Sequence, residues 1–95
     1  MTNETSIKRA IKDYLNIMHI DWFWNLQGLG VCPGLPDMFF FDKRDKKLVF
    51  LEVKTPKGQM SENQLLFKNT VEQYDVKFLL ARDAQDVIDY LNAAR

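Results

Sequence analysis

The segment from Pro36 to Lys54, PDMFFFDKRDKKLVFLEVK, contains two hydrophobic runs separated by a short charged stretch. Short runs rich in aromatic and β-branched residues are typical of β-strands, and a polar stretch between them is typical of a hairpin turn. We therefore expect strands over 36–42 and 47–54. Apolar residues alternate onto both faces of these strands, which predicts a sheet that is covered on both sides.

The turn fixes which residues of the two strands lie opposite each other. If Asp42 pairs with Lys47, Asp37 lies opposite Glu52, and opposite residues of an antiparallel pair share a face. Lys54 joins this face, because residues two apart on a strand point the same way. A slip of one residue would place the two acids on opposite faces. The hairpin therefore predicts that two carboxylates and one ammonium group converge.

Convergence of Asp37, Glu52 and Lys54 has a chemical use. Two carboxylates supply the oxygen ligands that hard divalent cations such as Mg²⁺ bind. A nearby ammonium group can stabilise negative charge that develops on a phosphate. Burying carboxylates in an apolar sheet costs free energy unless a cation or hydrogen bonds compensate. The pattern favours hydrolysis of a phosphodiester. The alternatives are a turn acid after Pro36 and a Glu52–Lys54 ion pair without catalytic function.

Hydrophobic spacing and turn residues define the remaining elements. Residues 4–18 show the three- and four-residue spacing of an amphipathic helix, and residues 27–35 contain three glycines and a proline, as a loop does. The other expected elements are a strand over 21–26, a helix over 61–74, a strand over 76–81 and a last helix capped by Asp83. The order α-β-β-β-α-β-α predicts the α/β class, with a small mixed β-sheet flanked by helices.

Composition limits the size and the surroundings of the protein. The 95 residues, 46% of them hydrophobic, suffice for one modest core, so we expect a single domain over 1–95. The lone cysteine excludes an internal disulfide, and no apolar run is long enough to cross a bilayer. The polar start does not resemble a signal peptide, so we expect a cytoplasmic protein. Basic and acidic residues balance at 13 each, which counts mildly against a nucleic-acid partner, although the basic residues cluster locally.

At its motif residues the chain resembles the PD-(D/E)XK nuclease superfamily, and within it the virus-type replication–repair nuclease (VRR-NUC) domain. The bare proline–acid and acid-x-lysine pattern is weak because it arises often by chance, whereas its extension is far more specific. The resemblance covers nearly the whole chain and implies a restriction-endonuclease-like core. The residues that carry it are Glu4, Gly34-Leu35-Pro36-Asp37, Glu52-Val53-Lys54-Thr55-Pro56-Lys57-Gly58 and Ser61-Glu62-Asn63-Gln64.

The resemblance implies a site for one or two Mg²⁺ or Mn²⁺ ions. Its ligands would be Asp37, Glu52, the Val53 carbonyl and Glu4, the last of these directly or through water. Lys54 would position the attacking water or offset negative charge on the phosphate. For Glu4 a second interpretation stays open, because an acid in a first helical turn also interacts favourably with the helix dipole.

Other motif residues have both a structural and a functional interpretation. The pattern Ser61-x-x-Gln64 is a capping box, in which the glutamine side chain accepts from the Ser61 amide, while the resemblance makes Gln64 part of the active site. Trp22 and Trp24 could stack on unpaired bases. Aromatic residues two apart in a strand are more often core or interface, which we expect here. His19 is expected at a helix end, without a catalytic role.

The function that the resemblance implies is that of a Mg²⁺-dependent DNA endonuclease. Standalone members are expected to be homodimers that act on branched DNA such as Holliday junctions, in bacterial or phage-infected host cells. The alternative, motivated by the net charge of zero, is a catalytically silent nuclease-like module that binds DNA or assembles with partners. A restriction-type enzyme with sequence specificity ranks below both, because we see no room for an added recognition element.

Overall fold

The computed structural model describes residues 3–25 and 33–93, and in them three helices and four strands follow the predicted order. Of the loop expected over 27–35, the part before residue 33 lies outside the described residues. None of the described helices is long and apolar enough to span a membrane. The elements are α1 (Glu4–Ile17), β1 (Trp22–Trp24), β2 (Met38–Asp42), β3 (Lys47–Val53), α2 (Glu62–Gln73), β4 (Lys77–Ala81) and α3 (Ala84–Asn92).

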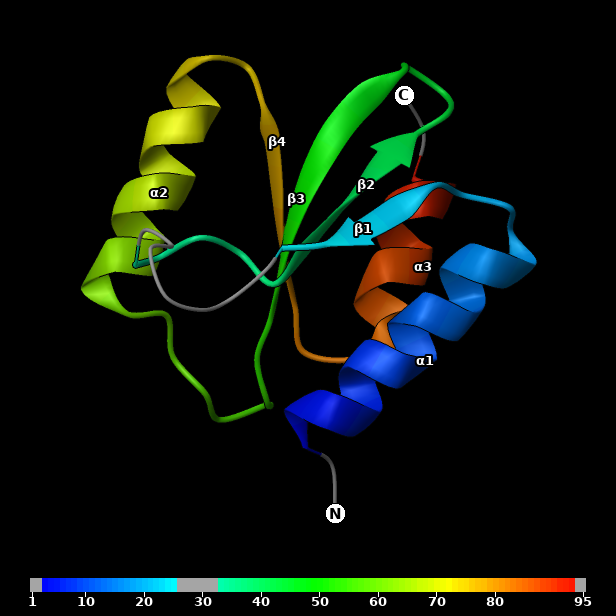
Figure 1. Cartoon of the computed structure of the whole chain (residues 1–95), viewed down its shortest axis with the longest axis horizontal. Coiled ribbons are helices and arrows are strands. Elements are labelled where there is room, and N and C mark those ends of the chain that lie inside the picture. Colours follow the sequence, from blue (N-terminus) through cyan, green and yellow to red (C-terminus); the bar gives the residue numbers. More distant parts are fainter. Residues whose placement is uncertain (1–2, 26–32, 94–95) are drawn as a thin grey trace.

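The strands form one mixed sheet in the order β1-β2-β3-β4 (Figure 1). Strand β2 is antiparallel to both β1 and β3, and β4 runs parallel to β3 after the crossover through α2. Asp42 pairs with Lys47 and Phe39 with Phe50, so the predicted hairpin register is confirmed. The predicted strand over 36–42 begins only at Met38, which leaves Asp37 in the bend just before it.

One face of the sheet packs against α1 and α3 and holds the hydrophobic core (Figure 1). Helix α1 contributes a stripe at i, i+4 and i+8, as its amphipathic spacing predicts. Complete burial of one such side chain is worth about 1.5–3 kcal/mol relative to exposure. The buried core residues are Ile7, Ile11, Leu15, Met38, Phe40, Val49, Leu51, Val53, Ala81 and Val87.

The opposite face of the sheet is only partly covered. Phe67 of α2 packs its ring against Phe50 and Phe78, above β3 and β4. Towards the other edge, Phe23 and Phe41 are 54% and 41% exposed. Among the residues that the structure describes, the expectation of a sheet covered on both sides is therefore wrong for its β1–β2 half. Helix α2 contacts β4 and lies away from β1, and none of its own residues is buried.

Local hydrogen bonds set where the helices begin. The Asn3, Ser61 and Asp83 side chains each accept from a backbone N–H in the first turn of α1, α2 and α3. Ser61 and Asp83 are the caps that the sequence predicts. A separate contact fastens the hairpin turn: the buried Asp42 carboxylate accepts two hydrogen bonds from the Arg44 guanidinium, which also donates to the Tyr90 carbonyl at the end of α3.

Candidate active site

Asp37 lies where the chain enters β2, and its backbone and side chain are both fixed. The Asp37 carbonyl accepts from the Asn25 N–H at 3.0 Å, and the Asn25 side chain donates to the Pro36 carbonyl at 2.7 Å. Asp37 Oδ2 accepts from the Val53 N–H at 2.8 Å, and Oδ1 lies 3.2 Å from Lys8 Nζ. The carboxylate is therefore held between the end of β3 and helix α1.

Glu52 lies near the end of β3 and is 3% exposed. Its Oε2 accepts from Gln64 Nε2 at 3.1 Å and lies 3.7 Å from Lys54 Nζ. Its Oε1 is buried and has no hydrogen-bond partner in the described parts of the chain. A buried carboxylate oxygen without a partner is costly. Glu52 thus offers a free ligand atom at the centre of the site.

The surroundings of Glu52 raise the pKa of its carboxyl from 4.5 to about 7. Burial is the largest cause. Next come the negative charge of Asp37 and a hydrogen bond between the two carboxyls, which forms only when one of them carries a proton. Lys54 offsets part of the shift, and Glu4 adds a smaller increase in the pKa. Two carboxyls this close compete for charge unless a cation joins them. Without a cation, the Glu52 carboxyl therefore keeps its proton over more of the acidic pH range than an ordinary glutamate does.

The Gln64 side chain forms the predicted capping box and also contacts Glu52. Its Oε1 accepts from the Ser61 N–H at 2.8 Å and completes the capping box, while its Nε2 donates to Glu52. One side-chain amide therefore connects the start of α2 to the acidic centre. The hydrogen bond from Gln64 Nε2 is made to Glu52 Oε2, and it leaves Glu52 Oε1 as the carboxylate oxygen that does not contact the amide.

Sequence reasoning missed two positions that shape the site. Lys8 pairs with Asp37, and its spacing of four from Glu4 was a signal that it shares a helix face with a motif residue. Arg82, directly after β4, donates from Nη1 to the carbonyls of Thr55 and Gly58 at 2.7 and 2.6 Å. Arg82 therefore holds the loop that follows Lys54. No local sequence pattern predicts this contact, because the two segments are far apart in the chain.

The acidic donors at the centre are Asp37 and Glu52. Within residues 3–25 and 33–93, no three Asp, Glu, His or Cys side chains lie together as a metal-binding group. Glu4, half-buried at the start of α1, influences the pKa of Glu52 but does not complete such a group. His19 ends the turn after α1 with φ 56°, as expected of a helix-end residue. Two carboxylates, one of them with a buried oxygen that accepts from no donor in the described residues, are oxygen donors of the kind that Mg²⁺ or Mn²⁺ binds.

The raised pKa of Glu52 predicts how the stability of the metal-free protein depends on pH. Because the folded state binds this proton more tightly than the unfolded state, the free energy of unfolding should fall as pH rises from about 4.5 to about 7 and level off above that. The expected loss is on the order of 1–3 kcal/mol. Denaturant unfolding in EDTA at pH 5 and pH 8 measures it. Glu52→Gln should reduce the difference, and an unchanged difference in this variant would contradict the assignment.

Comparison with known proteins gives two matches and one negative result. The family model of the VRR-NUC domain matches residues 4–85. A solved structure described as a VRR_NUC domain superposes with a TM-score of 0.79 at 17% sequence identity, and the match covers 99% of this chain and 100% of that one. At this identity the structural match speaks for the fold alone. A search of curated proteins gave no significant match.

Proposed function

The chain belongs to the VRR-NUC domain family, and we propose that it is a metal-dependent endonuclease that hydrolyses phosphodiester bonds in DNA. Family membership gives it a nuclease-type fold. The observation that carries the proposal is the convergence of Asp37 and Glu52, with the Glu52 Oε1 atom buried and unpaired within the described structure. Most buried carboxylate oxygens accept a hydrogen bond, so an ionised one without a donor is a candidate metal ligand.

In the proposed site, Asp37, Glu52 and the Val53 carbonyl would hold the ion, and Glu4 would contribute from α1, directly or through water. A bound Mg²⁺ or Mn²⁺ would polarise the phosphate and lower the pKa of a water molecule. Hydrolysis is a single step, in which a water oxygen bonds to phosphorus while the bond from phosphorus to the leaving oxygen breaks. The attacking water gives up one proton to solvent, and the leaving oxygen takes up one proton, so the products are a phosphomonoester and a free hydroxyl.

The remaining side chains position these groups and balance charge. Lys54 keeps its ammonium group 3.7 Å from Glu52 Oε2, where it can offset negative charge on the phosphate as the P–O bonds change. Gln64 holds the Glu52 carboxylate in one orientation. Lys8 supplies a second cation beside Asp37, on the side of α1. The site therefore combines two acids with two ammonium groups, which suits a substrate that brings its own negative charge.

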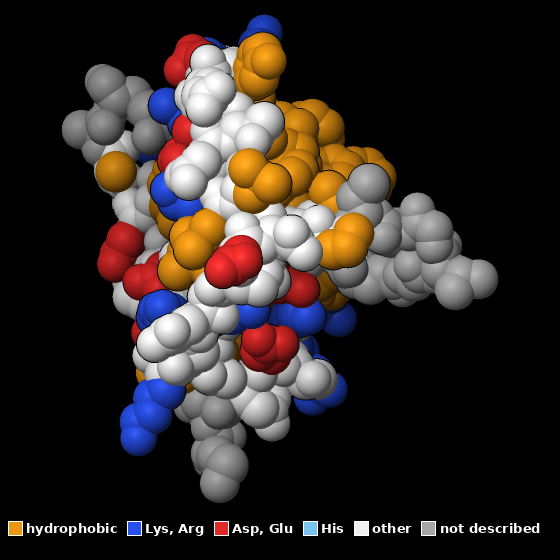
Figure 2. All heavy atoms as spheres, turned by 90° about the vertical axis from the view of Figure 1, so that its left-hand side faces the viewer, with side chains coloured by type: hydrophobic (Ala, Val, Ile, Leu, Met, Phe, Trp, Pro, Cys, Tyr) orange, Lys and Arg blue, Asp and Glu red, His pale blue; other side chains and the backbone are white. Residues whose placement is uncertain are grey.

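We also propose that two copies associate through the uncovered aromatic face. The rings of Phe23 and Phe39 stack at 5.4 Å, and Phe41 meets both edge-on. Figure 2 shows hydrophobic surface gathered beside α2. A typical dimer buries about 800 Å² per partner, a modest part of the 6323 Å² surface of this chain. Sedimentation velocity should give a dimer, and Phe41→Glu should shift it to the monomer; a monomeric wild type would contradict the proposal.

The substrate proposal is branched DNA, including four-way junctions, because a dimer with two sites can cut two strands. The experiment that tests the function incubates the protein with labelled four-way, flap and linear duplex DNA in Mg²⁺ or Mn²⁺. We expect faster cleavage of the branched substrates and no cleavage in EDTA. Complete inertness on every substrate in both metals would support the rival interpretation, a silent module that binds DNA without cutting it.

A further inference from the structure

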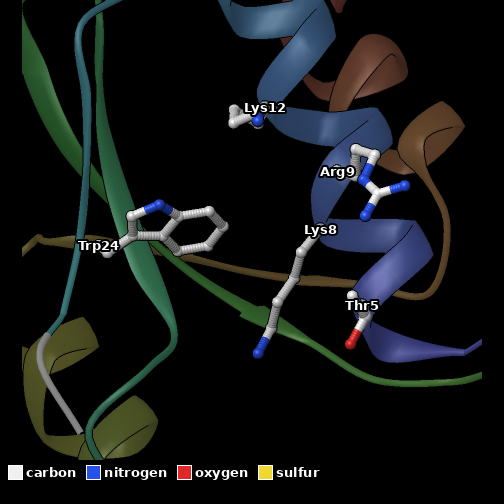
Figure 3. Close-up of a pocket in the computed structure, with 5 residues that line it drawn as sticks. All are labelled: Thr5, Lys8, Arg9, Lys12 and Trp24. Atoms are coloured by element: carbon white, nitrogen blue, oxygen red, sulfur yellow. The ribbon is translucent and has the colours of Figure 1, made fainter.

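A pocket of about 230 Å³ lies between β1 and the first half of α1 (Figure 3). Three of its lining residues are cationic, one is aromatic and none is acidic. Because the whole chain carries equal numbers of basic and acidic residues, this excess of positive charge is local and favours an anionic ligand. The lining residues are Thr5, Lys8, Arg9, Lys12 and Trp24.

Trp24 supplies the pocket with a partly exposed aromatic surface, and its ring meets that of Trp22 edge-on. It is 43% exposed, although it pairs with the fully buried Met38 on β2. Its neighbour Trp22 is half-buried, packs against the core and donates from Nε1 to Asn16. The expectation of a core position fits Trp22, whereas the Trp24 indole projects from β1 towards Lys8 and Lys12 on α1 (Figure 3).

Lys8 connects this pocket to the candidate active site. Its side chain lines the pocket, and its Nζ lies 3.2 Å from Asp37 Oδ1. A DNA strand with one phosphate beside Asp37 would therefore bring an adjacent nucleotide to the pocket. The pocket and the candidate active site therefore lie next to each other, and the Lys8 side chain contacts both.

Resting on the nuclease function proposed above, we infer that this pocket binds one unpaired nucleotide next to the phosphate that is cut. The base stacks on Trp24, and Lys12 pairs with the flanking phosphate. The pocket is smaller than the ~300–1,000 Å³ of sites for drug-sized ligands, which suits a single base. A base inside a duplex has both faces stacked on its neighbours and is not free to stack on Trp24. The pocket therefore selects DNA with a single-stranded segment at the cut.

Binding in EDTA tests this inference without any need for cleavage. Fluorescence anisotropy would compare a labelled oligothymidylate with a duplex of equal length. Trp24→Ala should weaken single-strand binding by about 5- to 150-fold, the range for one stacked base, and leave duplex binding unchanged. Trp24→Phe should recover most of the loss. Equal affinity of wild type and Trp24→Ala for the single strand, an equal loss on the duplex, or no single-strand binding by the wild type would overturn the inference.

The salt dependence of binding gives a second measurement, which uses a substitution on helix α1 and leaves strand β1 unchanged. Lys12→Gln should reduce the slope of log affinity against log salt for the single strand by about 0.7, the value for one phosphate contact. Lys43→Gln, an exposed lysine of the hairpin turn, is the matched control and should leave the slope unchanged. A slope equal to that of the wild type in Lys12→Gln would remove this residue from the pocket's function.

The binding and cleavage results separate the two proposals. If the protein binds single strands through Trp24 but cuts no substrate, the nuclease function is refuted and the nucleotide-binding role of the pocket is retained. A protein that cuts branched DNA while Trp24→Ala binds single strands normally would refute the pocket alone.

Discussion

Asp37→Asn is expected to reduce Mg²⁺-dependent DNA cleavage by about 10³-fold. A metal ion at a phosphoryl centre supplies several kcal/mol of charge stabilisation, and each 1.36 kcal/mol corresponds to a factor of ten in rate. Asn has the shape of Asp and can still accept from the Val53 N–H, the contact that Asp37 Oδ2 makes at 2.8 Å. It lacks the negative charge that the cation requires. Single-turnover cleavage of a four-way junction measures the effect.

The matched control for Asp37→Asn is Asp13→Asn, which removes an exposed acid from α1. This variant should cleave at the rate of the wild type. Thermal melts of both variants would establish that they are folded. A cleavage rate within a few-fold of wild type in Asp37→Asn would mean that this carboxylate is not a ligand.

Gly34→Ala is expected to destabilise the fold by about 3 kcal/mol or more. Gly34 has φ 94°, and a Cβ there would overlap the carbonyl oxygen of Asn63 at the start of α2. Left-handed backbone costs an alanine roughly 1–2 kcal/mol, and the overlap adds to this cost because backbone cannot turn aside as a side chain can. Denaturant unfolding measures the change.

A second substitution separates the two causes at Gly34. Asn tolerates positive φ better than Ala, so strain alone would make Gly34→Asn the milder variant. Because the overlap with Asn63 involves any Cβ, we expect Gly34→Asn to be about as destabilising as Gly34→Ala. Gly58→Ala is the control, since a Cβ there would meet the Thr55 hydroxyl oxygen at 3.1 Å and no positive φ is involved. Wild-type stability in Gly34→Ala would contradict the close packing of this loop on α2.

The centre of the fold was predictable because its signals are local. Successive side chains of the two hairpin strands point to opposite faces of the sheet. The charged turn sets the register, and only one register keeps Asp37 opposite Glu52. The structure has this register along the paired residues of β2 and β3. The capping box at Ser61 and the cap at Asp83 are also short-range patterns, and both form as expected.

The features of the fold and of the site that the sequence did not predict depend on contacts between segments distant in sequence. The position of α2 over β3 and β4, which leaves Phe23 and Phe41 exposed, follows from packing that no hydrophobic period encodes. Lys8 and Arg82 reach the site through long side chains, whose direction a pattern does not give. Trp24 has the spacing of a core residue but lies where β1 faces the basic side of α1. These features were not predicted because each depends on which helices and strands pack against one another in the fold.

The most direct test of the account is calorimetric titration of Mn²⁺ into the metal-free protein at pH 8, above the raised pKa of Glu52. We predict saturable binding by the wild type, its loss in Glu52→Gln, and its retention in Glu62→Gln, which removes an exposed acid of the same type from α2. Undiminished Mn²⁺ binding by a folded Glu52→Gln variant would contradict the claim that Asp37 and Glu52 together hold the ion.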